Sequence, residues 1–76
     1  MNLLASQVIR TARMRAGLTQ AEVAAHYGVE ERTLRRWENK ESNPDFRDVV
    51  GVVEGLGQDF LDVCKEASGS DAITVS

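Results

Sequence analysis

Four cationic side chains gather near the end of the segment LTQAEVAAHYGVEERTLRRWENK, residues 18–40. They are Arg32, Arg35, Arg36 and Lys40. An arginine guanidinium can bridge O6 and N7 of guanine with two hydrogen bonds, and each of these cations can pair with a phosphate. The carboxylate of Glu31, which lies among them, can accept a hydrogen bond from cytosine N4. The cluster therefore has side chains suited to the grooves and backbone of a nucleic acid duplex.

A short helix before the cluster is expected over about residues 19–27. Thr19 can cap its start, and Glu22 stands three residues later, which is the spacing of a capping box. Gly28 follows directly and predicts the end of the helix, because glycine adopts the left-handed conformation at little cost. A tight turn should therefore separate this helix from the charged segment.

The cluster itself is expected on a second helix over about residues 30–39. Leu34 and Trp37 are three residues apart, so they should form the buried stripe of this helix. The charged residues then lie mostly off that stripe and face outward. One α-helix fits the major groove of DNA, and a second helix packed behind it can fix how it lies there.

Three further helices are expected, which makes the fold class all-α, a compact five-helix domain. The first should cover about residues 3–16, with Ile9, Ala12 and Ala16 on its core face. The fourth should begin after Pro44, with Asp45 as cap and Asp48 completing an imperfect capping box. Its inward face is expected to hold Phe46, Val49, Val50, Val53 and Leu56. The fifth should start near Asp59, with Phe60, Val63 and Cys64 inward.

Length and composition predict one globular domain, because the chain has 76 residues of which 42% are hydrophobic. We place the folded domain at residues 1–67 and a flexible tail at 68–76. A chain this short buries only about 60% of its unfolded surface and gains from association with a second copy. There is no apolar run near 18 residues, and one cysteine cannot form an internal disulfide, so a cytoplasmic protein that spans no membrane is expected.

The net charge of −3 is unevenly distributed along the chain. Residues 1–40 hold seven Lys/Arg and four Asp/Glu, a balance of +3, whereas residues 41–76 hold two Lys/Arg and eight Asp/Glu, a balance of −6. A basic face can bind phosphates while the far side is acidic, because salt screens charges beyond about 10 Å. The acidic half should also repel DNA that approaches in the wrong orientation.

The order of these features resembles the helix-turn-helix of the phage repressor and Cro family, found in small phage and bacterial regulators of the lambda-repressor-like fold. The resemblance covers about residues 6–64. Its motif residues in this chain are Gln20, Ala24, Gly28-Val29, Trp37-Glu38-Asn39 and Asn43-Pro44. Each is individually weak, but their order and spacing together are specific.

The resemblance implies which residues contact DNA. Gln20 and Asn39 match positions that bind phosphates, and Arg32 and Arg36 match outward positions of the recognition helix. The complete predicted set is Gln20, Glu30, Glu31, Arg32, Thr33, Arg35, Arg36, Asn39 and Lys40. Lys40 replaces a frequent glycine, and Glu30 and Glu31 replace the usual Ser, Thr or Gln. The alternative for this face is a solvated surface with Glu31–Arg35 and Arg32–Arg36 neighbours.

Two structural assignments complete the expected site. The resemblance implies a partly buried ion pair between Arg13 and Glu38, which would hold the recognition helix against the first helix. Gly51 and Gly55 are four residues apart in the fourth helix, and either they face solvent or they form a flat strip for a second chain. We assign Gly51, Gly55 and Phe60 as the possible dimer contact.

The predicted function is sequence-specific DNA binding by a small phage or bacterial repressor, as a homodimer on a palindromic operator. The partners are double-stranded DNA and a second copy of the chain. No enzyme activity, cofactor or metal site is expected, because the lone His26 lacks partners for a metal. Two alternatives remain open. One is an antitoxin that also binds a toxin through its acidic segment, and the other is an adaptor that binds a protein such as an inhibitor and no DNA.

Overall fold

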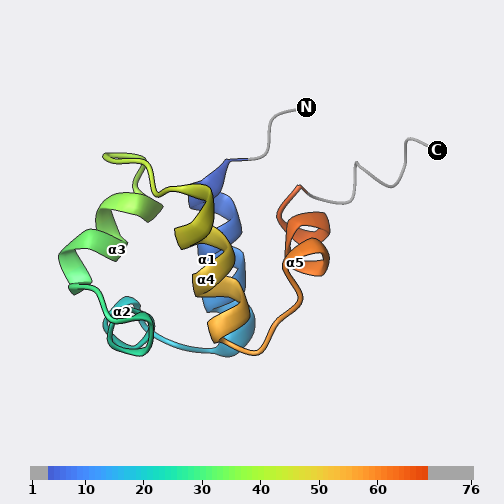
Figure 1. Ribbon diagram of the computed structural model, residues 1–76, viewed down its shortest axis with the longest axis horizontal. Coiled ribbons are helices and arrows are strands. Elements are labelled where there is room, and N and C mark those ends of the chain that lie inside the picture. Colours follow the sequence, from blue (N-terminus) through green and yellow to red (C-terminus); the bar gives the residue numbers. More distant parts are fainter. Residues whose placement is uncertain (1–3, 69–76) are drawn as a thin grey trace.

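Five α-helices make up the part of the chain that the structure, a computed structural model, describes, which is residues 4–68. They are α1 (Ala5–Ala16), α2 (Gln20–Tyr27), α3 (Glu31–Glu38), α4 (Phe46–Gly55) and α5 (Phe60–Ala67). Figure 1 shows α1 and α4 side by side in the centre, α2 and α3 at one end of the long axis, and α5 at the other. The prediction of an all-α, five-helix fold is confirmed.

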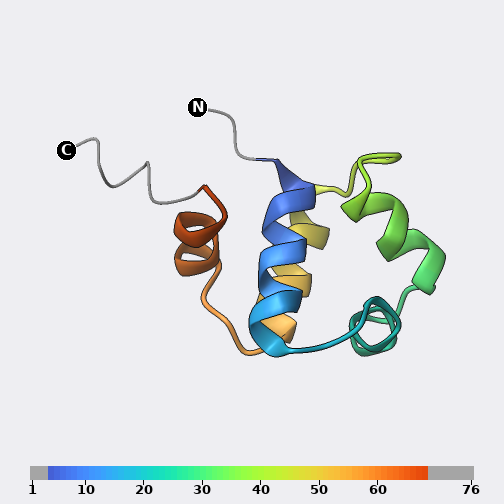
Figure 2. The same cartoon turned by 180° about the vertical axis from the view of Figure 1, so that it is seen from behind.

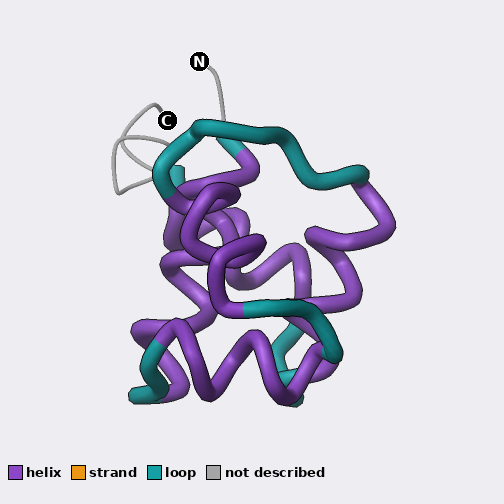
Figure 3. The backbone as a smooth tube through the Cα atoms, turned by 90° about the vertical axis from the view of Figure 1, so that its left-hand side faces the viewer, coloured by secondary structure: helices purple, strands orange, loops and turns teal. Residues whose placement is uncertain are grey.

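The arrangement is the same from behind, where α5 and α3 again lie on opposite sides of α1 and α4 (Figure 2). Figure 3 shows the molecule from the side of α2 and α3, with helices and loops only among the described residues. The predicted start of the first helix at residue 3 and most of the predicted tail lie outside those residues. None of the described helices has the length and hydrophobicity that crossing a membrane requires.

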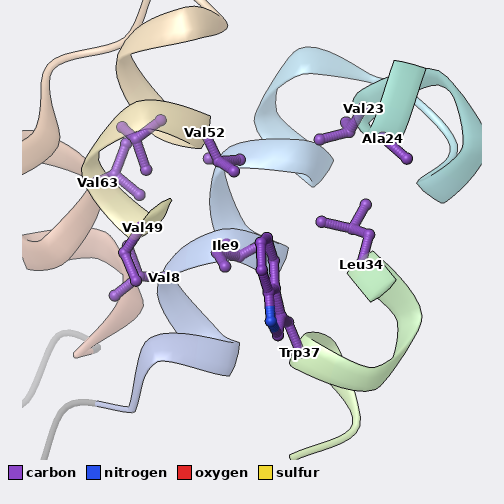
Figure 4. Packing of buried hydrophobic residues seen from close by; sticks show 11 residues of the cluster. Val8, Ile9, Val23, Ala24, Leu34, Trp37, Val49, Val52 and Val63 are labelled. Atoms are coloured by element: carbon purple, nitrogen blue, oxygen red, sulfur yellow. The ribbon is translucent and has the colours of Figure 1, made fainter. Parts of the chain in front are cut away.

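Every helix contributes side chains to one hydrophobic core (Figure 4). Ile9, Leu34, Val53 and Val63 come from four different helices and are completely buried. The remaining buried members are Val8, Ala12, Val23, Ala24, Trp37, Val49 and Val52. In Figure 4 Trp37 lies beside Ile9 of α1, and Leu34 lies toward Ala24 of α2, so the core side of α3 packs against two other helices.

Three expectations about the core were wrong or incomplete. Ala16 is exposed, because it is the last residue of α1 and the chain turns away at Gly17. Phe46 is 72% exposed, because it begins α4 and packs edge-on against Phe60, with ring centroids 5.6 Å apart, outside the core. Val52 is buried although its position was not predicted, because α4 meets α1 and α5 through Val49, Val52 and Val53 together.

The fourth helix approaches the second closely at Gly51. A Cβ built on Gly51 would lie 2.7 Å from Cε1 of Tyr27, so any larger residue would require the ring or the helix to shift. The Tyr27 hydroxyl donates a hydrogen bond to Asp48 Oδ1 at 2.9 Å, one turn earlier in α4. His26 Nε2 lies 2.7 Å from the carbonyl oxygen of Gly55. These contacts position α2 against α4.

Candidate nucleic-acid interface

The second helix begins and ends as its sequence predicts. The Thr19 hydroxyl accepts a hydrogen bond from the backbone N–H of Glu22 at 3.1 Å, and the Thr19 N–H donates to Glu22 Oε1 at 2.8 Å. Gly28 has φ +92°, in the left-handed region, and its N–H donates to the Ala24 carbonyl at 2.8 Å. This turn sets the direction of α3 relative to α2.

The third helix has one buried side and one charged, exposed side. Leu34 is fully buried, and Trp37 packs edge-on against Tyr27 with ring centroids 6.4 Å apart. Thr33 is half-buried. The other predicted contact residues of this segment are exposed: Glu30, Glu31, Arg32, Arg35, Arg36, Asn39 and Lys40. The structure therefore brings the cationic cluster onto one solvent-facing side of α3.

Only part of this charge is paired within the described chain. Arg35 Nη1 lies 3.7 Å from Glu31 Oε2, one turn earlier in α3, and both side chains are about half exposed. Neither Arg32 nor Arg36 lies within salt-bridge distance of a carboxylate of residues 4–68. Their guanidinium groups remain available for a ligand. Arg32 and Arg36, which the sequence places one turn apart, carry like charges and do not pair with each other.

Lys40 ends the helix in the conformation that a glycine would adopt. Its φ is +65°, and it is the one non-glycine residue between 4 and 68 with a positive φ. The Glu41 N–H donates to the Arg36 carbonyl at 2.9 Å, and the Lys40 N–H donates to the Trp37 carbonyl at 3.3 Å. These two bonds form a Schellman motif. Although Lys40 stands where a glycine is usual, α3 still ends in a Schellman motif. The positive φ of Lys40 has a cost in backbone strain.

A buried carboxylate lies at the junction of the first three helices. The Glu38 side chain has no exposed surface, and it accepts hydrogen bonds from Arg13 Nε at 2.7 Å and Arg13 Nη2 at 2.9 Å. Arg13 Nη1 also donates to the Leu18 carbonyl at 3.1 Å. The hydrogen bonds to Glu38 raise the pKa of the Arg13 guanidinium above its ordinary value, so Arg13 stays charged. The structure thus brings Arg13 and Glu38 together as a two-pronged ion pair.

Gln20 belongs to the same cluster. Its Nε2 donates to Glu38 Oε1 at 3.1 Å, and the side chain is only partly exposed. One amide N–H is thus engaged by Glu38, and the second N–H and the amide oxygen remain for other partners.

Arg10 is a residue of this cluster that the sequence analysis does not single out. Its Nε lies 4.0 Å from Glu38 Oε1, and its side chain is 62% exposed. The available signal was its position three residues before Arg13, which places both side chains on one side of α1.

The three residues assigned to a dimer contact have different surroundings. Gly51 faces Tyr27 of the same chain, and Gly55 is exposed with its carbonyl beside His26. Phe60 instead lines a groove of about 240 Å³ with Ala5, Val8, Pro44, Phe46, Val49 and Cys64. Burial there raises the pKa of the Cys64 thiol. The close approach of Tyr27 gives Gly51 a role within one chain.

Comparison with known proteins identifies this arrangement. The sequence profile of the helix-turn-helix family matches residues 9–63, which include all of α2, the turn and α3. No curated protein and no solved structure gives a significant match to the chain. The matched region covers most of the chain, and the match identifies the protein as a DNA-binding helix-turn-helix regulator. This protein belongs to the phage repressor and Cro-type helix-turn-helix family of DNA-binding proteins.

Proposed function

We propose that this regulator is a small phage or bacterial repressor that binds a palindromic operator as a homodimer, with α3 in the major groove. The observation that supports it best is the exposed face of α3. There Arg32 and Arg36 have no carboxylate partner among residues 4–68, while Leu34 on the other side is fully buried. A firmly packed helix with two available guanidinium groups suits direct contact with guanine O6 and N7.

The flanks of α3 suit the phosphate backbone. Gln20 at the start of α2 keeps one amide N–H available, and Asn39 and Lys40 are exposed at the end of α3. Contacts of this kind fix the register of a protein on DNA and make affinity depend on salt, whereas side chains in the groove determine sequence preference. Glu31 and Arg35 form an ion pair. If either residue binds a base or a phosphate, this pair has to rearrange.

A single α3 covers few base pairs, so specificity in a long genome favours two copies on two half-sites about 34 Å apart. The proposed surface for association differs from the glycine strip expected from the sequence. It consists of Phe46, Phe60 and Leu61, of which Phe46 is 72% and Leu61 67% exposed. Phe46 and Phe60 line the apolar groove between α1, α4 and α5, and Leu61 follows Phe60 in α5. Figure 1 shows α5 at the opposite end of the molecule from α3.

The test is selection of DNA ligands from a randomised duplex library at two salt concentrations, followed by sequencing. Enrichment of a palindrome, with weaker binding at higher salt, is the expected result.

Arg32→Ala and Arg36→Ala should each reduce operator affinity by about 1–3 kcal/mol and relax the preference at one base position. Arg15→Ala is the matched control, because Arg15 pairs with Asp62 and Glu66 of α5. A folded protein that enriches no sequence would exclude this function and favour a protein partner.

The dimer surface is tested by sedimentation of Leu61→Glu. A buried carboxylate at an apolar contact is costly, so the variant should sediment as a monomer at concentrations where the wild type is a dimer. Met14→Glu is the control, because Met14 is similarly exposed, at 65%, on α1. Equal association of the two variants would place the contact elsewhere.

A further inference from the structure

We propose that Arg10 is a phosphate-binding residue that acts together with Gln20, a role that rests on the proposed DNA binding. Two guanidinium groups, those of Arg10 and Arg13, lie near the Glu38 carboxylate. Arg13 directs three of its N–H groups inward, two to Glu38 and one to the Leu18 carbonyl, and its side chain is 14% exposed. Arg13 thus neutralises Glu38 and has little left to offer a ligand.

Arg10 is the surplus charge of this cluster. Its Nε lies 4.0 Å from Glu38 Oε1, which is beyond hydrogen-bond distance, and its side chain is 62% exposed. One carboxylate and two guanidinium groups leave a net charge of +1, and that charge is on the exposed member. Because Glu38 accepts its three hydrogen bonds from Arg13 and Gln20 and none from Arg10, releasing Arg10 toward solvent breaks no hydrogen bond.

The same carboxylate oxygen places Arg10 next to Gln20. Gln20 Nε2 donates to Glu38 Oε1 at 3.1 Å, and Arg10 Nε lies 4.0 Å from the same oxygen. The separation of the two nitrogen atoms therefore cannot exceed the sum of these two distances. A phosphate carries two non-bridging oxygens, and the pair can offer a charged donor to one and an amide donor to the other. Both residues contact the last residue of α3, so they lie beside the end of the helix that is proposed to enter the groove.

Arg15 supplies the contrast on the same helix. Its Nη2 lies 3.1 Å from Asp62 Oδ2 and its Nε 3.4 Å from Glu66 Oε1, both on α5. Its charge is therefore compensated by α5, the helix that Figure 2 shows on the side of α1 away from α3. Arg10 and Arg15 thus differ in surroundings while sharing side-chain type and helix.

The experiment measures how binding varies with salt for Arg10→Gln and Arg15→Gln, on the selected operator and on a scrambled duplex of the same length. For Arg10→Gln, the slope of log Kobs against log salt should become shallower by about 0.9 for each bound protomer, on both duplexes. The ratio of the two affinities should stay the same, because phosphate contacts do not depend on sequence. Arg15→Gln should keep the wild-type slope.

Two further measurements keep the proposal testable. Arg10→Lys retains the charge and should restore most of the slope, and ethylation of the contacted phosphate should weaken the wild type more than Arg10→Gln, in which only Gln20 still contacts that phosphate. An unchanged slope for Arg10→Gln, or a loss confined to the operator, would overturn the role of Arg10 while leaving DNA binding intact. A wild type that binds neither duplex would overturn both proposals, and the melting temperature of Arg10→Gln shows whether that variant is folded.

Discussion

Arg13 Nε lies 2.7 Å from Glu38 Oε2, and this contact joins α1 to the last residue of α3 across 25 positions of the sequence. The Glu38 side chain is completely buried, and that of Arg13 is partly buried, with 14% of its surface exposed. A pair this well bonded is costly to separate, because removing one member leaves the other charge buried without compensation. Its role is to fix the orientation of α3, since both residues direct their bonds inward.

We therefore expect Glu38→Gln to lower the free energy of unfolding by about 3–5 kcal/mol, measured by urea denaturation. The amide keeps the shape of the side chain but leaves the Arg13 charge unpaired. Glu54→Gln, on the exposed side of α4, is the control and should change the stability little. Equal midpoints for the two variants would show that the ion pair is unimportant for stability, and a double-mutant cycle with Arg13→Gln would measure the coupling directly.

Lys40 gives a prediction in which stability and binding change in opposite directions. A left-handed conformation costs an L-residue about 1–2 kcal/mol, and glycine avoids most of it but loses more entropy on folding. Lys40→Gly should therefore raise the free energy of unfolding by roughly 1 kcal/mol. The same change removes a cation from the proposed interface, so DNA binding should weaken and depend less steeply on salt.

The neighbouring Asn39 provides the matched control for the backbone effect. Its φ is −91°, which any residue adopts, so Asn39→Gly should lower stability where Lys40→Gly raises it. Chemical denaturation of both variants decides the matter. If Lys40→Gly is the less stable protein, strain at residue 40 is not the dominant effect.

Gly51 and Gly55 are one turn apart in α4 and should respond oppositely to alanine. At Gly51 a methyl group would meet Tyr27 Cε1 at 2.7 Å, whereas at Gly55 nothing lies within 4 Å. Overpacking typically costs about 1–3 kcal/mol, so Gly51→Ala should destabilise the protein even though alanine favours the helix. Gly55→Ala should be neutral or stabilising by up to about 1 kcal/mol.

Thermal unfolding of the two alanine variants compares them directly. A Gly51→Ala protein at least as stable as Gly55→Ala would show that Tyr27 moves aside without cost. In a Tyr27→Ala background the clash is absent, so Gly51→Ala and Gly55→Ala should there change the stability by similar amounts. The pair Gly51→Leu and Gly55→Leu is unsuitable for testing a dimer, since a side chain at residue 51 also has to displace Tyr27 within the same chain.

Local sequence patterns predicted the helices well, because caps and turns depend on neighbouring residues. Thr19 with Glu22, Gly28, and Asp45 with Asp48 are each found at the helix boundaries that their types predicted. Hydrophobic periodicity was less reliable at helix ends. There Ala16 and Phe46 fit the apolar stripe but remain exposed, because the chain turns away after Ala16 and Phe60 meets Phe46 only edge-on.

The long-range features of the site were harder to anticipate. The position of Arg10 beside Gln20 depends on how α1, α2 and α3 meet at Glu38, which one-dimensional spacing does not contain. The contact of Gly51 with Tyr27 is likewise a relationship between two helices 24 residues apart in the sequence. Glycine in a helix predicted a close approach, but the partner came from the same chain.

Tyr27 is the only tyrosine of the chain, so its ionisation can be followed by ultraviolet absorbance without interference from another phenol. Burial raises the pKa of Tyr27 above its ordinary value, and the hydrogen bond to Asp48 adds to the effect, because a tyrosinate would face a carboxylate. Since the folded state holds this proton more tightly than the unfolded state, the phenol's contribution to stability is fully present below about pH 10 and is lost as pH rises through the folded-state pKa.

We expect the absorbance midpoint of the native protein to lie above that of the urea-unfolded chain. In Tyr27→Phe this alkaline loss should be absent, while the missing hydrogen bond costs about 1 kcal/mol at neutral pH. Coincident midpoints for the folded and unfolded chains would mean that the phenol is solvated and that the close contacts at Gly51 and Asp48 do not persist in solution.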